Sequence, residues 1–479
     1  MREQPIASAD RFLESFYPAA EVLKAHIEKG NVIRIITHND ADGVAAGGIL
    51  SQLLRRMGAR FKTTCEKRLD EEMVKAVGAE DPPLVLFADM GGAYLDLLEE
   101  HLSGSDVVVL DHHLPVDVEP SNIIHINPLL HDLDGARGIS GAGVSYLFAK
   151  TIDEGNADLS PLGIVGALAD QQDKGEKKSL LGLNKLIEAD AKKLGLLDTN
   201  FDLIFYGYET RPIGKAFAYT TTPFIPGLSG REDRCLAFLK EAGIELKNEG
   251  RWRALRDLSD EEKRSLFSAL TKHMVYEGCE AEAVHDLVGT IYTLKGEEAW
   301  TPMRDGREYA SLLNACARMG RPSLGLCICM GDRNEALKEA EGTLDDYRRN
   351  IGKYLDWVRE GDRIQEREHI YTLNADVDID ERIIGVVASI LLSTGILKSF
   401  KPIVASANAD GDLIKISARA SEEMADKGLD LGDVMMKASE QCEGRGGGHD
   451  IAAGAFLPGG RREDFLGLVD RIVGEQVKA

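Results

Sequence analysis

The chain has 479 residues, of which 43% are hydrophobic and 29% are charged, and its formal net charge is −23. This composition predicts a soluble globular protein of about two to four domains. The negative charge disfavours a broad basic surface for duplex nucleic acid, although a local groove or bound cations would still permit a nuclease.

Neither the first residues nor the rest of the chain predict a membrane protein. No apolar run approaches the ~20 residues of a membrane span. The N-terminus lacks the apolar middle of a signal peptide, so we expect a cytoplasmic protein without a membrane contact. The seven cysteines are scattered without a C-x-x-C pair. They are typical of reduced, buried thiols and not of a disulfide framework or a zinc site.

The first part of the chain, residues 1–210, alternates apolar runs with helical patterns. This alternation is typical of βαβ units around a parallel sheet, so we predict an α/β catalytic domain. Polar residues recur at the carboxyl ends of the strands, where open α/β sheets bind their ligands. The predicted strands are 32–38, 84–90, 107–113 and 123–128, and the predicted helices are 43–57, 140–152 and 159–170.

The remaining chain divides into two further regions. Residues 211–305 are rich in charge and predict an inserted or linking region that is mostly helical, with helices at 232–242 and 259–276. Residues 306–479 predict a smaller α/β domain, which includes a long amphipathic connector helix at 333–360. Its other expected elements are strands at 369–377 and 452–458, helices at 381–393 and 430–442, a hairpin around Asp410-Gly411 and a glycine-rich loop at 444–450.

Acidic residues and histidines gather at the ends of four predicted elements. His38, Asp40 and Asp42 alternate over five residues, which predicts three side chains on one side of an extended turn. Gly43 would then let the backbone turn tightly into a helix. The other members of this set are Asp89, Asp111, His112, His113 and Asp170.

Carboxylates that converge at one sheet edge repel one another unless cations lie between them. Two divalent cations would remove the repulsion and would assist the hydrolysis of a phosphate ester. The mixture of carboxylate and imidazole ligands favours two Mn²⁺ ions, with Mg²⁺ as the alternative. Each segment alone is a weak signal, since a single aspartate after a strand is more often a helix cap. The combination of four segments in one α/β unit carries the prediction.

The C-terminal region adds a candidate binding site for phosphate. Arg419 ends an apolar strand, and its guanidinium could donate two hydrogen bonds to a phosphate. The loop Gly446-Gly447-Gly448 would let backbone N–H groups approach an anion, with His449 as a further donor. The alternative for this loop is a flexible connection.

These motifs, taken in order, resemble those of a known family. HNDADG (38–43), the Asp89 segment, DHH (111–113) and the Asp170 segment resemble the four motifs of the DHH phosphoesterase superfamily. The SAR (417–419) and GGGH (446–449) segments resemble those of its associated substrate-binding domain, DHHA1. HxDADG and REYASLLNACARMGR (307–321) are similar to the archaeal RecJ-like exonucleases. The resemblance implies a parallel-sheet DHH domain followed by a smaller α/β DHHA1 domain.

The resemblance also implies a role for each candidate residue. Asp111 would orient the histidines, and His113 would contact the scissile phosphate. Arg419 and His449 would hold a phosphate from the opposite lobe, so that a single strand would enter and a duplex would not. The implied ligands of the first metal are His38, Asp40 and the bridging Asp89, and those of the second are Asp42, His112 and Asp170.

Three hypotheses on function follow from the motifs and this resemblance. The first is a Mn²⁺-dependent exonuclease that releases nucleoside monophosphates from single-stranded DNA or RNA in replication or repair. The second is a phosphodiesterase of short oligonucleotides or cyclic dinucleotides. The third is a replisome scaffold that partners a GINS-type complex and a helicase. Cleavage polarity, DNA or RNA preference and oligomeric state leave no short motif in the sequence.

Overall fold

The computed structural model describes residues 6–118, 120–220, 225–279, 284–393, 397 and 400–478. The chain forms two compact units, each of which gathers separate segments. Unit 1 contains residues 1–213, 247–258 and 288–345, and unit 2 contains residues 214–246, 259–287 and 346–479. This division places residues 306–345 in unit 1, whereas the sequence grouped 306–479 together. No helix in the described part of the chain is long and apolar enough to cross a membrane.

Unit 1 is built on a parallel sheet of five strands in the order β2-β1-β3-β4-β5. All neighbouring strands are parallel, so their carboxyl ends meet at one edge of the sheet. This arrangement confirms the predicted α/β fold class. The strands are β1 (Val32–His38), β2 (Arg60–Glu66), β3 (Leu84–Ala88), β4 (Asp106–Leu110) and β5 (Ile123–Ile126).

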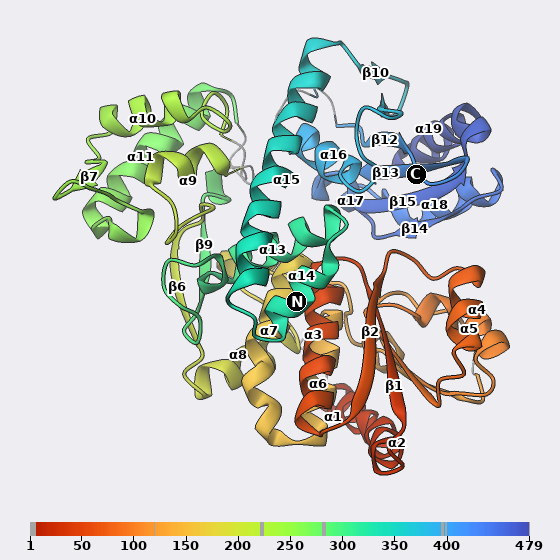
Figure 1. Cartoon of the computed structure of the whole chain (residues 1–479). Helices are drawn as coiled ribbons and strands as arrows, with labels where there is room; N and C mark the ends of the chain where they lie inside the picture. Colours follow the sequence, from red (N-terminus) through yellow and green to blue (C-terminus); the bar gives the residue numbers. More distant parts are fainter. Residues whose placement is uncertain are drawn as a thin grey trace. The chain divides into compact units, whose positions relative to one another are not determined.

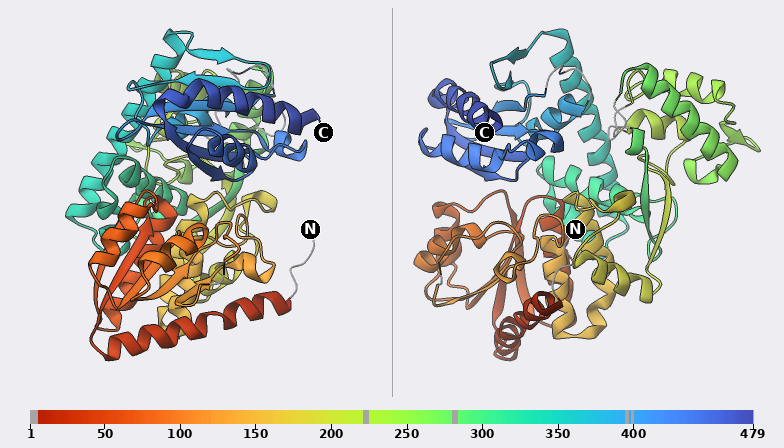
Figure 2. Two further views of the ribbon diagram at one scale, coloured as in Figure 1. Left: turned by 90° about the vertical axis from the view of Figure 1, so that its right-hand side faces the viewer. Right: turned by 180° about the vertical axis from the view of Figure 1, so that it is seen from behind.

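Helices cover both faces of this sheet (Figures 1 and 2). Helices α4 and α5 pack on the face that carries Ile36, Phe87 and Val109. Helices α3, α6 and α7 cover the opposite face and pack against one another. The helices of this region are α1 (Ile6–Glu14), α2 (Phe16–Glu28), α3 (Ala41–Arg56), α4 (Glu71–Ala79), α5 (Leu95–His101), α6 (Gly141–Ile152), α7 (Ser160–Ala169) and α8 (Asn184–Lys193).

Strand β2 was missed by the sequence prediction. Its residues RFKTTCE are mostly polar and at most partly buried, because β2 is an edge strand of the sheet. An edge strand lacks the continuous apolar run that marks the buried central strands. Strand β1 has the predicted bounds, since all but its first and last residues are fully buried.

An antiparallel ribbon of β6 (Leu197–Leu203) and β9 (Val288–Leu294) flanks the middle region. The two predicted helices of that region are confirmed as α10 (Glu232–Glu241) and α11 (Asp260–Tyr276). Ser259 caps α11 in a reciprocal pair with Glu262. The other α-helices and strands described between residues 204 and 360 are α9 (Ile213–Tyr219), β7 (Lys247–Asn248), β8 (Arg251–Trp252), α13 (Gly306–Arg318), α14 (Pro322–Cys329) and α15 (Glu335–Glu360).

Unit 2 contains a second, mixed sheet in the order β10-β11-β12-β13-β15-β14. The expected hairpin around Asp410-Gly411 is confirmed, because β12 and β13 pair antiparallel on either side of it. The glycine-rich segment differs from the predicted loop: Arg445–Gly448 forms β14, an edge strand paired with β15. The remaining bounds are β10 (Ile364–Glu366), β11 (Tyr371–Asn374), α16 (Ile384–Ser393), β12 (Ile403–Asn408), β13 (Leu413–Arg419), α17 (Glu422–Asp426), α18 (Leu431–Glu440), β15 (Ala452–Pro458) and α19 (Arg462–Lys478).

The glycines of β14 explain why this strand resembled a loop in sequence. A Cβ at Gly446 would lie 2.7 Å from the carbonyl oxygen of Met435 on α18. A Cβ at Gly448 would lie 2.6 Å from the Cα of Ala453 on β15. Both glycines therefore permit close packing of the strand, a role that β-propensity does not predict.

Candidate active site

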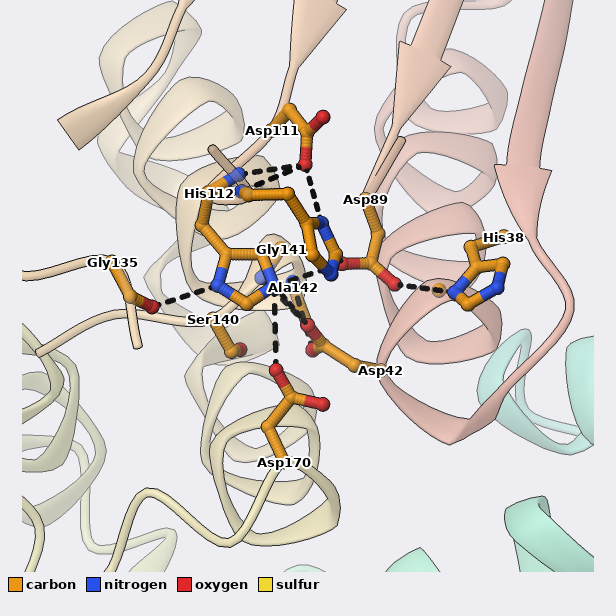
Figure 3. Close-up of polar contacts among 12 residues, drawn as sticks. His38, Asp42, Asp89, Asp111, His112, Gly135, Ser140, Gly141, Ala142 and Asp170 are labelled. Carbon is orange, nitrogen blue, oxygen red and sulfur yellow. Dashed lines mark hydrogen bonds and ion pairs between the residues drawn. The ribbon is translucent and has the colours of Figure 1, made fainter. Parts of the chain in front are cut away.

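The four acid-bearing segments of unit 1 meet at the carboxyl edge of the parallel sheet (Figure 3). His38 is the last residue of β1, and Asp89 directly follows β3. Asp111 directly follows β4, and Asp170 caps the end of α7. Because the strands are parallel, residues far apart in sequence lie within a few ångströms of one another.

Asp40 and Asp42 are positioned by the start of α3, and not by the extended turn that the sequence predicted. The carboxylate of Asp40 accepts a hydrogen bond from the backbone N–H of Gly43 at 2.9 Å, so the helix begins at Ala41. Asp42 therefore lies within the first turn of α3. Its side chain is buried and points toward the start of α6.

The N-terminus of α6 holds the Asp42 carboxylate. The backbone N–H groups of Gly141 and Ala142 donate to its two oxygens at 2.6 and 3.0 Å. These groups are among the four helix N–H groups without an intrahelical partner, and they favour a negative charge. Gly166 on α7 leaves room for this contact, since a Cβ there would lie 2.1 Å from Asp42 Oδ1.

Two sets of potential ligands share Asp89 (Figure 3). In the first set, His38 Nδ1 lies 2.9 Å from Asp40 Oδ2 and 3.4 Å from Asp89 Oδ2. In the second set, His112 Nε2 lies 3.1 Å from Asp89 Oδ1, 3.3 Å from Asp170 Oδ2 and 3.8 Å from Asp42 Oδ2. Asp89 thus presents one carboxylate oxygen to each set.

Asp89 adopts an unusual backbone conformation, with φ at 59°. This left-handed region is uncommon for residues other than glycine, although aspartate and asparagine enter it more readily than most. Its backbone N–H donates to the carbonyl of Leu110 at 2.9 Å, which ties the turn to β4. Gly141 leaves room for the Asp89 side chain, since a Cβ at Gly141 would lie 2.4 Å from Asp89 Oδ1.

Asp111 lies behind the histidines and is 1% exposed. Its Oδ1 accepts from the backbone N–H groups of His112 and His113 at 2.8 and 3.2 Å and lies 2.8 Å from His113 Nδ1. Its Oδ2 accepts from the backbone N–H of Gly92 at 2.8 Å. The ring of His112 has a different partner: its Nδ1 lies 2.7 Å from the carbonyl oxygen of Gly135.

Without a cation, burial and the close approach of the carboxylates raise the pKa of two of them, Asp42 and Asp170, whereas neighbouring histidines lower the pKa of Asp40 and Asp111. Burial raises the pKa of Asp170 to about 7, and the neighbouring Asp89 adds to this effect. Burial, Asp89 and Asp170 likewise raise the pKa of Asp42 well above its usual value. Burial lowers the pKa of His112, but the surrounding carboxylates outweigh it, so that pKa is also raised.

The donor set fits divalent cations. His38 Nδ1, Asp89 Oδ1 and His112 Nε2 are buried and make no well-oriented hydrogen bond among the described residues, although carboxylate oxygens lie as close as 2.9 Å to His38 Nδ1 and 3.1 Å to His112 Nε2. Three groups of carboxylates and imidazoles have ligand atoms within 4.8 Å of one another. Buried polar atoms without partners are costly, and a cation would satisfy them. The groups are Asp89-His112-His113, His38-Asp40-Asp89 and Asp42-His112-Asp170.

The predicted phosphate-binding residues lie in unit 2. Arg419 ends β13, and its Nε donates to Ser389 Oγ at 3.0 Å. The backbone N–H of His449 donates to the carbonyl of Ala452 at 2.9 Å, directly after β14. A Cβ at Gly447 would meet no atom within 4 Å, so packing does not require glycine there. A role for Arg419, the three glycines and His449 in substrate binding stays a prediction.

Sequence reasoning missed the residues that hold the ligands in place. Gly135, Gln172 and Asn184 form a buried hydrogen-bonded chain behind His112. Single residues in loops or at a helix start give no periodic signal, and the partners of Gln172 lie 12 to 37 residues away in sequence. The serine at position 140, which caps α6, was recognisable in principle as a helix start before an apolar run.

We expect the affinity for Mn²⁺ to rise with pH between about pH 6 and about pH 8. A carboxyl group with a pKa of about 7 is protonated below that pH and must release its proton before it binds a cation. The affinity should change by about tenfold per pH unit for each proton displaced. Calorimetric titration in buffers of different ionisation enthalpy measures both the affinity and the released protons. Identical affinities across this range would contradict the prediction.

Comparisons with known proteins cover almost the whole chain. Residues 32–169 match the model of the DHH family N-terminal domain, residues 205–288 match the DHH-CID domain, and residues 369–475 match the DHHA1 domain. An uncharacterized protein of Methanocaldococcus jannaschii is 32% identical over 452 residues, which cover 93% of this chain and 94% of that protein. The single-stranded-DNA-specific exonuclease RecJ of Dickeya dadantii is 30% identical over 145 residues, or 28% of this chain and 25% of that protein.

Solved structures show the same fold. RecJ of Thermus thermophilus in complex with Mn²⁺ has a TM-score of 0.59 at 19% identity; the match covers 96% of this chain and 55% of that chain. The same protein has also been solved with Mg²⁺. CDC45 of Entamoeba histolytica has a TM-score of 0.65 at 13% identity and is covered over 99% of its length. The present chain thus spans about half the length of the Thermus RecJ.

The full-length relative, the three domain models in order and the cluster of histidines and aspartates at the sheet edge agree with one another. The chain belongs to the DHH family and is a DHH phosphoesterase with a DHHA1 domain.

Proposed function

We propose that the protein is a metal-dependent exonuclease that hydrolyses single-stranded nucleic acid and releases nucleoside monophosphates, in DNA replication or repair. The observation that carries the two-metal part of this proposal is the position of Asp89. Its two oxygens face two separate ligand sets, at 3.4 Å from His38 Nδ1 and 3.1 Å from His112 Nε2. A carboxylate in this position suits a bridge between two cations. Two bound Mn²⁺ or Mg²⁺ ions would activate water and neutralise the phosphate.

The residues of the chain prepare this site in distinct ways. Asp42 is held by the start of α6, and His112 by the carbonyl of Gly135, so both ligands are oriented before a cation binds. Their fixed orientation lowers the entropy cost of forming the site.

His113 is the candidate for contact with the scissile phosphate. Its side chain is 39% exposed, whereas that of His112 is 1% exposed. Burial and the neighbouring His112 lower the pKa of His113, but the bond to Asp111 outweighs them and the pKa is raised. The ring therefore favours the positive form, which stabilises negative charge on a phosphate oxygen.

The polymer substrate is supported by the similarity to RecJ and by the size of the chain. A panel of end-labelled substrates in Mn²⁺ tests it: single-stranded DNA, single-stranded RNA, duplex DNA, dinucleotides and cyclic dinucleotides. We expect mononucleotide release from single strands and little from duplex DNA. Hydrolysis of dinucleotides or cyclic dinucleotides alone would instead support a phosphodiesterase of short substrates.

We expect Arg419→Ala and His449→Ala to raise KM for single-stranded DNA by about 10–100-fold, since a hydrogen bond to a charged group contributes about 1.5–3 kcal/mol. The kcat should change little, because neither residue belongs to the metal cluster of unit 1. Steady-state kinetics on a labelled oligonucleotide measures both constants. Arg445→Ala, at the exposed start of β14, is the matched control. An unchanged KM in both variants would show that neither Arg419 nor His449 binds the substrate.

The middle region supports a second candidate function. Residues 205–288 match the DHH-CID domain, and the fold of the whole chain matches that of CDC45. A scaffold role in a replisome, with a GINS-type complex as partner, is compatible with catalysis in the same chain. Size-exclusion chromatography of the full chain with purified GINS tests it, and a chain that lacks hydrolytic activity but binds GINS would favour the scaffold alone.

A further inference from the structure

A buried glutamine lies two residues after the candidate ligand Asp170. The side chain of Gln172 is fully buried. Its Nε2 donates to the carbonyl oxygens of Gly135 at 3.1 Å and Ile139 at 3.2 Å, and its Oε1 accepts from Asn184 Nδ2 at 2.8 Å. Each hydrogen-bonding atom of this amide therefore has a partner, although the residue belongs to none of the ligand groups.

The orientation of this amide is fixed by its partners. Two carbonyl oxygens can only accept hydrogen bonds, so the nitrogen of Gln172 must face Gly135 and Ile139. Its oxygen then faces Asn184, which must present its own nitrogen. The backbone N–H of Asn184 also donates to the carbonyl of Gly138 at 2.9 Å. The loop 135–139 is thus held by two buried amides.

This loop determines which nitrogen of His112 is available as a ligand. The carbonyl of Gly135 accepts from His112 Nδ1 at 2.7 Å as well as from Gln172. Because a carbonyl only accepts, Nδ1 carries the hydrogen, and in the neutral ring Nε2 then keeps the lone pair that a cation needs. Nε2 is the atom that faces Asp89, Asp170 and Asp42. Gly135 has to be glycine, since a Cβ there would lie 2.3 Å from the His112 carbonyl oxygen.

Gln172 is also connected to the other two ligands of this set. Ile139 precedes Ser140, the cap of α6, and the next two N–H groups hold Asp42. On its other side, the backbone N–H of Gln172 donates to the carbonyl of Ala167 at 2.9 Å and closes the end of α7 around Asp170. The residue between them, Gln171, has φ at 54°, which reverses the chain there.

We propose that Gln172 is a positioning residue for one metal site only, the site formed by Asp42, His112 and Asp170. The inference rests on the proposed two-metal function. Among the described residues, Gln172 makes no hydrogen bond to the β1–α3 turn that carries His38 and Asp40. That turn is fixed separately, by the bond between Asp40 and Gly43. The two metal sites therefore depend on different supporting residues.

The test is the binding of Mn²⁺ to Gln172→Met, which keeps the length of the side chain and removes its hydrogen bonds. Mn²⁺ alone is titrated, and bound and free ions are counted by electron paramagnetic resonance. We expect the wild type to bind two ions. The variant should bind one ion with wild-type affinity and the other about 10–100-fold more weakly, as for other residues that orient metal ligands.

The matched control is Asn156→Leu, which removes another buried amide in unit 1. Asn156 Nδ2 donates to the carbonyl of Ala149 at 3.0 Å, near the end of α6 that is remote from the metal cluster. This variant should bind two ions as the wild type does. If Gln172→Met does not fold, Asn184→Ala removes the outer partner of Gln172 and should weaken the same single ion.

Two results would overturn the inference: unchanged binding of both ions in the folded variant, or equal weakening of both. For Asn184→Ala, unchanged binding of both ions or equal weakening of both would likewise overturn the inference. A wild-type protein that binds no Mn²⁺ would instead overturn the proposed two-metal function.

Discussion

Asp89→Asn is expected to lower Mn²⁺-dependent hydrolysis of single-stranded DNA by about 10³-fold or more. Asparagine has nearly the same shape and also tolerates the left-handed backbone that Asp89 adopts. It offers one oxygen where the carboxylate offers two, so it cannot face both ligand sets with negative charge. Cations contribute several kcal/mol of transition-state stabilisation, and about 4 kcal/mol corresponds to a factor of about 10³.

Single-turnover release of labelled mononucleotides measures this effect. Asp132→Asn is the matched control, because Asp132 has the same φ of 59° but is exposed and lies outside the ligand groups. The control should retain the wild-type rate. Comparable rates for Asp89→Asn and the wild type would refute the metal cluster as the catalytic centre.

Gly166→Ala is expected to disrupt the site although it removes no functional group. The added Cβ would lie 2.1 Å from Asp42 Oδ1 and 2.4 Å from the Cβ of Ala142. Asp42 must then leave the N-terminus of α6, and α6 and α7 must separate. We expect the free energy of unfolding to fall by about 1–3 kcal/mol, as for other overpacked cores. One Mn²⁺ ion should bind on the order of 100-fold more weakly.

Gly163→Ala is a close control on the same helix, one turn earlier. Its Cβ would lie 3.1 Å from Ile187 Cγ2, a side-chain methyl that can shift, and it does not face the acidic cluster. Alanine gains about 1 kcal/mol of helix propensity over glycine, which should offset the tight contact. Thermal unfolding and Mn²⁺ titration of both variants measure the difference. Equal stability and equal Mn²⁺ affinity of the two variants would show that the close packing at Gly166 does not hold Asp42.

The sequence predicted the elements whose residues are uniformly buried. The central strands β1, β3 and β4 are continuous apolar runs followed by the candidate ligands, so both the strands and the edge of the sheet were recognisable. The edge strands β2 and β14 were missed because polar residues in one and glycines in the other give no apolar run.

The sequence predicted which residues form the candidate site. It did not predict that different supporting residues hold the two ligand sets. The sequence placed Asp42 with His38 and Asp40 in one turn, whereas the early start of α3 turns Asp42 toward α6. The bond from Gln172 to Gly135 spans 37 residues and connects two loops. No local pattern encodes such a contact, because it depends on the packing of α6 against α7.

The most direct test of the two-metal account is anomalous diffraction from crystals of the protein grown with Mn²⁺. We expect two manganese peaks about 3.5–4 Å apart, on either side of the Asp89 carboxylate. One peak should lie beside His38 and Asp40, and the other among Asp42, His112 and Asp170. A single peak, or two peaks that do not share Asp89, would contradict it.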